Sequence, residues 1–301
     1  MITKIKTSND KPKEKVRLRF RVTKFDLVKL FILYIVLSPV CAMGLYNHLI
    51  FFPFKDQYDL KDAIAKIESA TDSKKIDLTI PSANNQTISA WYFKKSGAKK
   101  IILVSHGNGG NIAHRLAFVA PLLLSNCSVL LYDYAGYGLS SGEATIPVIK
   151  QDGLDAYDYV RNVLHYGPKD IIVYGESLGS GVTTYIAQNR PVAGIIIQSG
   201  FASLTMAAKD RLPWLQLYPA IAFSGIEMDN AGYLHGSHAP LLLIHGDKDV
   251  VLPIKHADKN FAEASQPKRF VRIAGAGHND TSTLNPKQYA MPIWEFVKGL
   301  P

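Results

Sequence analysis

The sequence predicts an α/β protein with a mostly parallel central sheet and helices on both faces. After residue 76, short apolar runs rich in β-branched residues alternate with longer helical segments, which is typical of βαβ units. The strand-like runs lack the apolar–polar alternation of a half-exposed strand, as expected where helices cover both faces of the sheet. With 301 residues, of which 47% are hydrophobic, the chain is long enough to bury one large core.

The predicted elements follow one another with short connections. A turn and a polar helix over 53–70 lead to an opening hairpin over 76–80 and 89–93, with Asn84 and Asn85 in its turn. Further strands are predicted over 101–105, 129–132, 171–174, 194–198, 241–245 and 270–273. Helices are predicted over 111–124, 145–164, 182–188, 254–264 and 286–300.

The basic character of the chain is concentrated in its N-terminal tail, residues 1–29. This tail holds ten Lys or Arg against three acidic residues, so it carries +7 of the net charge of +9. The rest of the chain is nearly neutral and shows no basic helix with interleaved aromatic residues, so nucleic-acid binding is not expected. The two cysteines, Cys41 and Cys127, are expected in different environments and unpaired, and no Cys/His cluster has the spacing of a zinc site.

Residues 30–50 are predicted to form a transmembrane anchor ahead of a folded body that covers 51–301. The stretch 30–54 contains no Asp, Glu, Lys or Arg, and a spanning helix needs about 20 mostly apolar residues. The basic tail before it predicts a cytoplasmic N-terminus and a folded body on the outer side, periplasmic, extracellular or luminal. A signal peptide with Val40 and Ala42 before its cleavage site, or a hydrophobic helix of the body, are the alternatives.

The chain carries a Gly-x-Ser-x-Gly motif, Gly-Glu-Ser-Leu-Gly (175–179), between a predicted strand and a predicted helix. A nucleophilic serine needs this setting because a sharp strand-to-helix turn lifts its hydroxyl above the sheet edge. Gly175 and Gly179 would leave room where strand and helix backbones nearly touch. Since the pattern occurs by chance in roughly one in ten chains of this length, Ser177 needs partners before it indicates catalysis.

The loop after strand 101–105 is a candidate oxyanion hole. It reads Ser-His-Gly-Asn-Gly-Gly-Asn (105–111), and the ends of parallel strands place such loops at one edge of the sheet. The backbone N–H groups of Asn108 and of Leu178, the residue after the serine, are the predicted donors. The alternative is a plain tight turn in which Asn111 caps the next helix.

A candidate acid and a candidate base follow the last two strands. His-Gly-Asp-Lys-Asp (245–249) contains two carboxylates, of which Asp249 is favoured over Asp247 as the group that orients a histidine. Gly-His-Asn-Asp (277–280) contains His278, the only histidine after the final strand, and it is the predicted base.

Other residues of similar type are expected to be structural. Asp133, at the end of strand 129–132, is less well placed than the acid near the last strands. His106 and His245 each begin a glycine turn, which favours a role in the turn itself.

In this order, the four motifs resemble those of the α/β-hydrolase superfamily over roughly residues 76–301. Together with the N-terminal anchor and the apolar stretch 49–53, they are similar to its membrane-anchored "alpha/beta hydrolase domain-containing" subgroup, which includes bud-emergence-type and depalmitoylase-like proteins. The resemblance implies hydrolysis of carboxylic esters or thioesters, small or lipid-like, without a cofactor. Ser177 would form an acyl-enzyme, with His278 as the base and Asp249 as the orienting acid.

The segment 201–240 is short where some relatives insert a large lid, so a small cap and an open cleft are expected. Its apolar residues either pack a helix on the sheet or form an acyl-binding wall, in which case Leu217→Asp and Phe223→Asp would impair long-chain esters more than acetyl esters. These residues are Phe201, Leu204, Trp214, Leu215, Leu217, Tyr218, Ile221 and Phe223. Two other functions stay open: a peptidase or amidase with the same triad, and a catalytically silent, membrane-tethered interaction protein.

Overall fold

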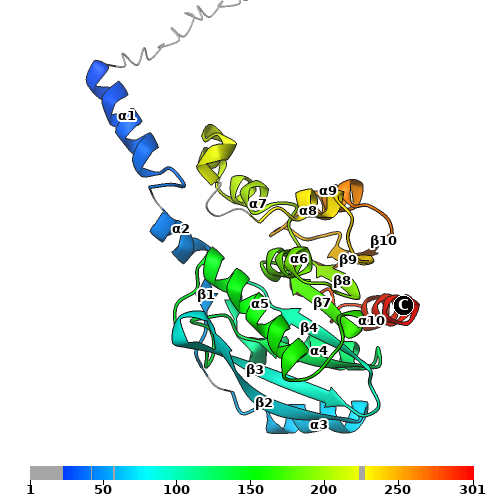
Figure 1. The fold of residues 1–301 in the computed structure, drawn as a ribbon. Helices are drawn as coiled ribbons and strands as arrows, with labels where there is room; N and C mark the ends of the chain where they lie inside the picture. The colour runs from blue at the N-terminus through cyan, green and yellow to red at the C-terminus, as the bar shows by residue number, and fades with distance from the viewer. Residues whose placement is uncertain (1–22, 42, 57, 224–227) are drawn as a thin grey trace, which may run out of the picture.

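An eight-stranded sheet forms the centre of the computed structural model, which describes residues 23–41, 43–56, 58–223 and 228–301 (Figure 1). Its strand order is β10-β9-β8-β7-β4-β6-β3-β2. The hairpin of β2 and β3 and the β3–β6 pair are antiparallel, and every other neighbouring pair is parallel. The strands are β2 (Ser73–Ser82), β3 (Gln86–Lys95), β4 (Lys100–Ser105), β6 (Cys127–Tyr132), β7 (Ile171–Glu176), β8 (Gly194–Gln198), β9 (Leu241–Gly246) and β10 (Lys268–Ile273).

Helices cover both faces of this sheet, which confirms the predicted α/β architecture. On one face lie α3 (Lys61–Thr71), α4 (Leu116–Leu123) and α10 (Pro286–Gly299); on the other lie α5 (Ile146–Asn162), α6 (Gly179–Asn189) and α9 (Lys255–Glu263). Successive residues of β4 enter different cores: Ile101 and Leu103 face α5 and α6, whereas Ile102 and Val104 face α4 and α10. Such two-sided burial explains the continuous apolar runs of the central strands.

The cap, residues 201–240, lies between β8 and β9. It contains α7 (Leu204–Arg211), the 3₁₀ turns η4 (Pro213–Leu217) and η5 (Ala220–Phe223), and α8 (Asn230–His235). The segment predicted as one helix over 111–124 begins as a 3₁₀ turn, η2 (Ile112–Arg115), before α4. Asn111 starts that turn, because its side-chain oxygen accepts the N–H of Ala113 at 3.0 Å.

The prediction of one continuous helix over 30–50 is wrong. The chain forms α1 (Lys24–Val36), leaves the helix at Leu37 and forms α2 (Met43–Ile50). Pro39 explains the break, because it lacks an N–H and disfavours helical geometry at Ser38. Within the described ranges, no helix combines the length and the apolar character needed to cross a bilayer. The basic tail up to residue 22 lies outside the described residues.

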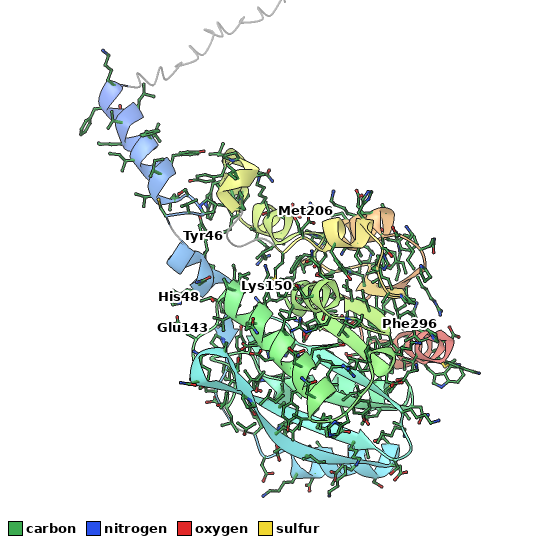
Figure 2. All side chains as sticks on the ribbon, viewed as in Figure 1. Tyr46, His48, Glu143, Lys150, Met206 and Phe296 are labelled. Carbon is green, nitrogen blue, oxygen red and sulfur yellow. The ribbon has the colours of Figure 1, made fainter. Side chains whose placement is uncertain are left out.

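The helix α1 extends away from the sheet and touches the cap near its C-terminal end (Figure 2). The ring of Tyr34 stacks on Tyr218 with centroids 4.5 Å apart, and the Tyr218 hydroxyl donates to the Tyr34 carbonyl at 2.7 Å. Most other apolar side chains of α1 are exposed, including Phe25, Phe31 and Leu30. After α2, the two-residue strand β1 (Phe52–Pro53) pairs with β5 (Gly109–Gly110) in the loop after β4.

Candidate active site

Ser177 occupies a sharp turn between β7 and α6. Its φ of 51° lies in the left-handed region, which is costly for a residue with a side chain. The turn holds because the Ser177 N–H donates to the Gln198 carbonyl at 2.9 Å and because two glycines allow close backbone contact. A Cβ on Gly179 would lie 2.0 Å from the Ser105 carbonyl oxygen, and one on Gly175 would lie 2.5 Å from that of Gly179.

The structure brings together the three residues predicted as a triad. His278, in the loop after β10, has its Nε2 2.9 Å from the Ser177 Oγ and its Nδ1 2.7 Å from Oδ2 of Asp249, in the loop after β9. An ionised carboxylate can only accept hydrogen bonds, so Nδ1 carries the proton and Nε2 accepts the serine hydroxyl. In this tautomer, the unprotonated Nε2 of His278 faces the hydroxyl of Ser177.

Asp249 is held in its ionised form. Burial alone would raise its pKa, but hydrogen bonds from His245 and His278 outweigh burial and hold the pKa well below its ordinary value. Its other oxygen, Oδ1, accepts the N–H groups of Val251 and Leu252 at 2.9 and 2.8 Å. The competing carboxylate, Asp247, instead accepts the N–H of Gly275 at 2.8 Å.

Asp133 and His106 lie close to each other and contact the segment after β4. Oδ1 of Asp133 accepts the N–H of Ile112 at 2.9 Å and lies 3.4 Å from Nε2 of His106. Nδ1 of His106 is 2.7 Å from the Gly107 carbonyl oxygen. Both side chains are buried, and Asp133 supports the start of the helical segment after β4.

His245 was expected to belong to a turn only, but it contacts the candidate acid. Its Nε2 lies 2.8 Å from the Leu252 carbonyl oxygen and 3.2 Å from Oδ2 of Asp249. Both of these oxygens accept, so Nε2 carries a proton that they share. The spacing of four residues in His-Gly-Asp-Lys-Asp was the only sequence signal for this contact, and it fits many turns equally well.

The predicted oxyanion donors, the backbone N–H groups of Asn108 and Leu178, border the same pocket as Ser177. Neither N–H donates a hydrogen bond to another group of the described chain. The remaining polar atoms of Asn108 are held in place: its Nδ2 donates to the Ile50 carbonyl at 3.0 Å, and its carbonyl accepts the Tyr137 hydroxyl at 2.6 Å. The loop is therefore fixed by its side chain and carbonyl while its N–H stays free for a ligand.

A buried ion pair, which no sequence motif indicates, connects this loop to the turn at Ser177. Nε of Arg115 lies 2.6 Å from Oε2 of Glu176, the residue before the serine. The same oxygen accepts the N–H of Gly107 at 3.1 Å, and Nη2 of Arg115 donates to the Gly109 carbonyl at 2.8 Å. One arginine and one glutamate thus connect the two segments that carry the candidate oxyanion donors, Asn108 and Leu178.

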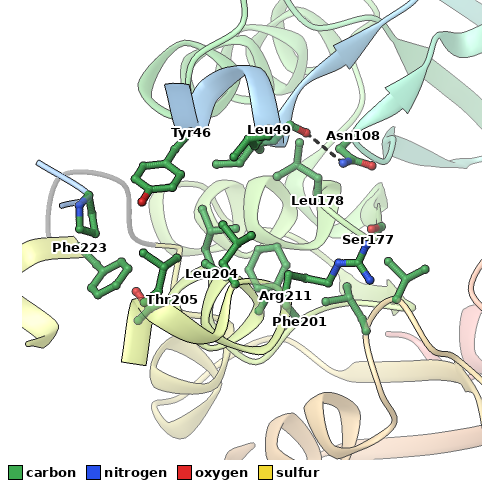
Figure 3. Close-up of a pocket in the computed structure, with 18 of the residues that line it drawn as sticks. Tyr46, Leu49, Asn108, Ser177, Leu178, Phe201, Leu204, Thr205, Arg211 and Phe223 are labelled. Carbon is green, nitrogen blue, oxygen red and sulfur yellow. Dashed lines mark hydrogen bonds between the residues drawn. The ribbon is translucent and has the colours of Figure 1, made fainter. Parts of the chain in front are cut away.

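An apolar pocket of about 430 Å³ opens beside Ser177 (Figure 3). Its walls come from the N-terminal segment and from the cap, and they include Pro39, Tyr46, Leu49, Leu204, Leu215 and Phe223. The expectation that Leu217 forms part of such a wall is wrong, because 71% of this residue is exposed, whereas Phe223 is 1% exposed. Trp214 and Ile221 are exposed as well, since η4 and η5 turn these side chains outward.

Comparison with known proteins identifies the family. A family model described as "alpha/beta hydrolase fold" matches residues 100–222. An uncharacterized protein of Mycobacterium tuberculosis is 31% identical over 225 residues, which span 73% of this chain and 78% of the relative. The human "Alpha/beta hydrolase domain-containing protein 17B" is 30% identical over 202 residues, or 66% of this chain and 67% of the relative. The chain belongs to the α/β-hydrolase family.

Solved structures share the α/β-hydrolase fold at much lower identity. The Pyrococcus furiosus esterase Pf2001 superposes with a TM-score of 0.66 at 18% identity, covering 83% of this chain and 98% of the esterase. The carboxylesterase EstE1, cloned from a metagenomic library, gives a TM-score of 0.60 at 18% identity, covering 81% of this chain and 98% of that enzyme. In this α/β-hydrolase, the N-terminal wall of the pocket, from Pro39 to Phe52, lies outside the region that the family model matches.

Proposed function

We propose that this α/β-hydrolase is a serine hydrolase that cleaves carboxylic esters or thioesters through an acyl-enzyme on Ser177. The observation that carries the proposal is the hydrogen-bonded series from the Ser177 hydroxyl through His278 to Asp249, with distances of 2.9 and 2.7 Å. A serine hydroxyl is a weak nucleophile unless an adjacent base removes its proton, and this arrangement supplies that base.

The proposed reaction has two steps that use the same groups. His278 Nε2 takes the proton of Ser177 while the oxygen attacks the acyl carbon, and the N–H groups of Asn108 and Leu178 stabilise the resulting oxyanion. The histidine then gives the proton to the departing alcohol or thiol, which leaves the acyl group on Ser177. A water molecule, deprotonated by His278, then attacks the acyl carbon, and His278 returns the proton to the oxygen of Ser177 as the acid leaves. Asp249 stabilises the imidazolium formed in each step.

The pocket supports an acyl substrate, because the walls beside Ser177 are mostly aliphatic and aromatic. Two proteins that share the fold are named as an esterase and a carboxylesterase, which favours ester cleavage. The human relative belongs by name to the alpha/beta hydrolase domain-containing proteins, and we assign this chain to their membrane-anchored subgroup as part of the proposal.

Active-site labelling with a fluorophosphonate tests the function. We expect wild-type protein to be labelled and Ser177→Ala to be unlabelled, while Ser265→Ala, which changes a half-buried serine outside the pocket, is labelled normally. Failure of the wild type to react would favour a catalytically silent interaction protein. Hydrolysis of p-nitroanilides in preference to p-nitrophenyl esters and thioesters would instead favour an amidase or peptidase.

We also propose that the N-terminal segment attaches the protein to a membrane, with the tail on the cytoplasmic side and the catalytic domain on the outer side. Supporting this, α1 exposes a row of apolar side chains, and its Tyr34 touches a cap whose Leu217 and Ile221 are also exposed. Exposed apolar surface of this kind is typical of sites that contact lipid or protein.

Vesicle flotation tests the attachment. Full-length protein should float with anionic vesicles, and the double change Phe31→Asp and Ile35→Asp should weaken flotation, whereas Leu139→Asp, at an exposed residue of the loop after β6, should not. Equal flotation of all three proteins would exclude α1 as the attachment site. Protease digestion of intact membranes, with tags at both ends of the chain, tests the orientation.

A further inference from the structure

One charged side chain borders the apolar pocket beside Ser177. Among the described residues that line this pocket, Arg211 alone carries a formal charge at neutral pH. An apolar wall would serve an acyl chain without any cation, so the arginine needs a separate explanation.

The guanidinium of Arg211 has no charged partner among the described residues. Arg211 is the last residue of α7 and is exposed, with no ion pair or hydrogen bond to another described residue. Its neighbours differ: Lys209 donates to the Tyr218 carbonyl at 3.2 Å, and Lys255 pairs with Asp210 at 2.8 Å. A cation at a helix C-terminus stabilises the helix dipole, but Lys209 in the same turn already provides this effect.

The direction of the side chain connects Arg211 to the reaction. In Figure 3 its guanidinium extends along the pocket toward Ser177, while its aliphatic part lies among the apolar walls. A guanidinium presents a planar fork of donors that matches a carboxylate or phosphate group. The fork lines the same pocket as the serine and is therefore suited to an anionic group of the substrate.

We propose that Arg211 selects esters or thioesters that carry a carboxylate or phosphate on the leaving-group side of the scissile bond. The inference rests on the proposed serine hydrolase activity. The enclosed end of the pocket, near Tyr46 and Phe223, is apolar and suits the acyl chain. Arg211 is exposed to solvent, so we place the departing alcohol or thiol on its side of the pocket. Arg211 is thus a specificity-determining residue for the leaving group.

A matched pair of chromogenic esters tests this selection. The hexanoyl ester of 3-hydroxy-4-nitrobenzoate carries a carboxylate on its leaving group, and the corresponding carboxamide ester is uncharged. We expect the ratio of their kcat/KM values, corrected for their rates of alkaline hydrolysis, to favour the carboxylate about tenfold in the wild type, as a charge-assisted hydrogen bond at an exposed site would give. The preference should shrink when ionic strength rises from 0.05 to 0.5 M, because salt screens exposed charges.

Three variants separate this role from a structural one. Arg211→Gln should abolish the preference, and Arg211→Lys, which keeps the charge at the helix end but not the fork, should retain part of it. Arg269→Gln, at an exposed arginine of β10 outside the pocket, should keep the wild-type ratio. Thermal unfolding of each variant confirms that it is folded.

Two further substrates test where the anionic group must lie, and their outcomes distinguish the inference about Arg211 from the proposed serine hydrolase activity. p-Nitrophenyl adipate, whose carboxylate is on the acyl side, should show no comparable dependence on Arg211, and a phosphate-bearing leaving group should show the same dependence as the carboxylate. The inference is overturned if the ratio is the same in the wild type and Arg211→Gln, or if the acyl-side carboxylate responds equally. No turnover of any ester, together with no fluorophosphonate labelling, would instead overturn the proposed function itself.

Discussion

Replacing Arg115 by methionine should destabilise the protein strongly, because it breaks the ion pair that joins the segment after β4 to the turn at Ser177. The side chains of Arg115 and Glu176 are only 12% and 7% exposed, and the pair is 2.6 Å long. Without the arginine, the Glu176 carboxylate keeps one partner, the N–H of Gly107, and its charge stays buried. Methionine fills a similar volume, so the change tests the charge more than the packing.

The expected loss follows from the burial of the pair. Removing one member of a buried ion pair typically costs about 3–5 kcal/mol, because the remaining charge has no compensation. In a domain of this size, 1 kcal/mol corresponds to roughly 2–4 °C in Tm, so we expect Tm to fall by about 10 °C. The loop carrying Asn108 also loses its bond from Nη2 of Arg115 to the Gly109 carbonyl, so kcat for ester hydrolysis should fall as well.

A double-mutant cycle measured by urea unfolding provides the assay. Glu176→Gln removes the charge but keeps an oxygen that can accept the Gly107 N–H, so the double variant Arg115→Met/Glu176→Gln should be more stable than Arg115→Met alone. The reasoning would be refuted if Arg115→Met cost less than about 1 kcal/mol, the range of an exposed pair, or if Glu176→Gln gave no recovery.

Three further predictions concern the acid, the pocket and a buried carboxylate. Asp249→Asn should lower kcat of ester hydrolysis about 10⁴-fold with a smaller effect on KM, because His278 loses the acceptor that fixes its tautomer; a loss below tenfold in steady-state kinetics would contradict this. Phe223→Asp should reduce kcat/KM for p-nitrophenyl octanoate more than for the acetate, whereas Leu217→Asp should leave that selectivity unchanged; equal effects of the two variants would place the acyl site elsewhere. Burial raises the pKa of Asp152 to about 6, above its value in the unfolded chain, so the folded protein takes up this proton between roughly pH 7 and 5 while the unfolded chain stays ionised. This group alone should then raise the free energy of unfolding by about 1 kcal/mol from pH 7 to pH 5. Asp152→Asn should remove that slope in denaturant titrations, and an unchanged slope would assign it to other groups.

The alternation of apolar strands with helices made the sheet, and the residues at the ends of its strands, predictable from the sequence. The central strands bury both faces, so their apolar runs are unmistakable, and parallel strands bring their ends to one edge. Ser177 follows the buried strand β7 directly, and Asp249 and His278 lie in the loops after β9 and the edge strand β10, so knowing the strands was enough to expect them close together.

Contacts that depend on tertiary geometry could not be read from the sequence. Arg115 and Glu176 are 61 residues apart, and neither has a neighbour whose type implies the other. Leu217 and Phe223 look equivalent as apolar residues, but two short 3₁₀ turns send one outward and the other inward. Composition also favoured one long helix over 30–50, whereas a single proline divides it and lets the second half border the pocket.

The pairing of β1 with β5 connects the N-terminal segment to the loop after β4. The N–H groups of Phe52 and Phe54 donate to the carbonyls of Asn108 and Gly110. A displacement of the N-terminal segment would therefore also displace the loop that contains the candidate oxyanion donor. A chain shortened to begin at residue 60 would keep the serine, histidine and aspartate yet lose one side of that loop's support. We therefore expect the shortened chain to hydrolyse esters more slowly than the full-length hydrolase, because its loop after β4 is less well supported.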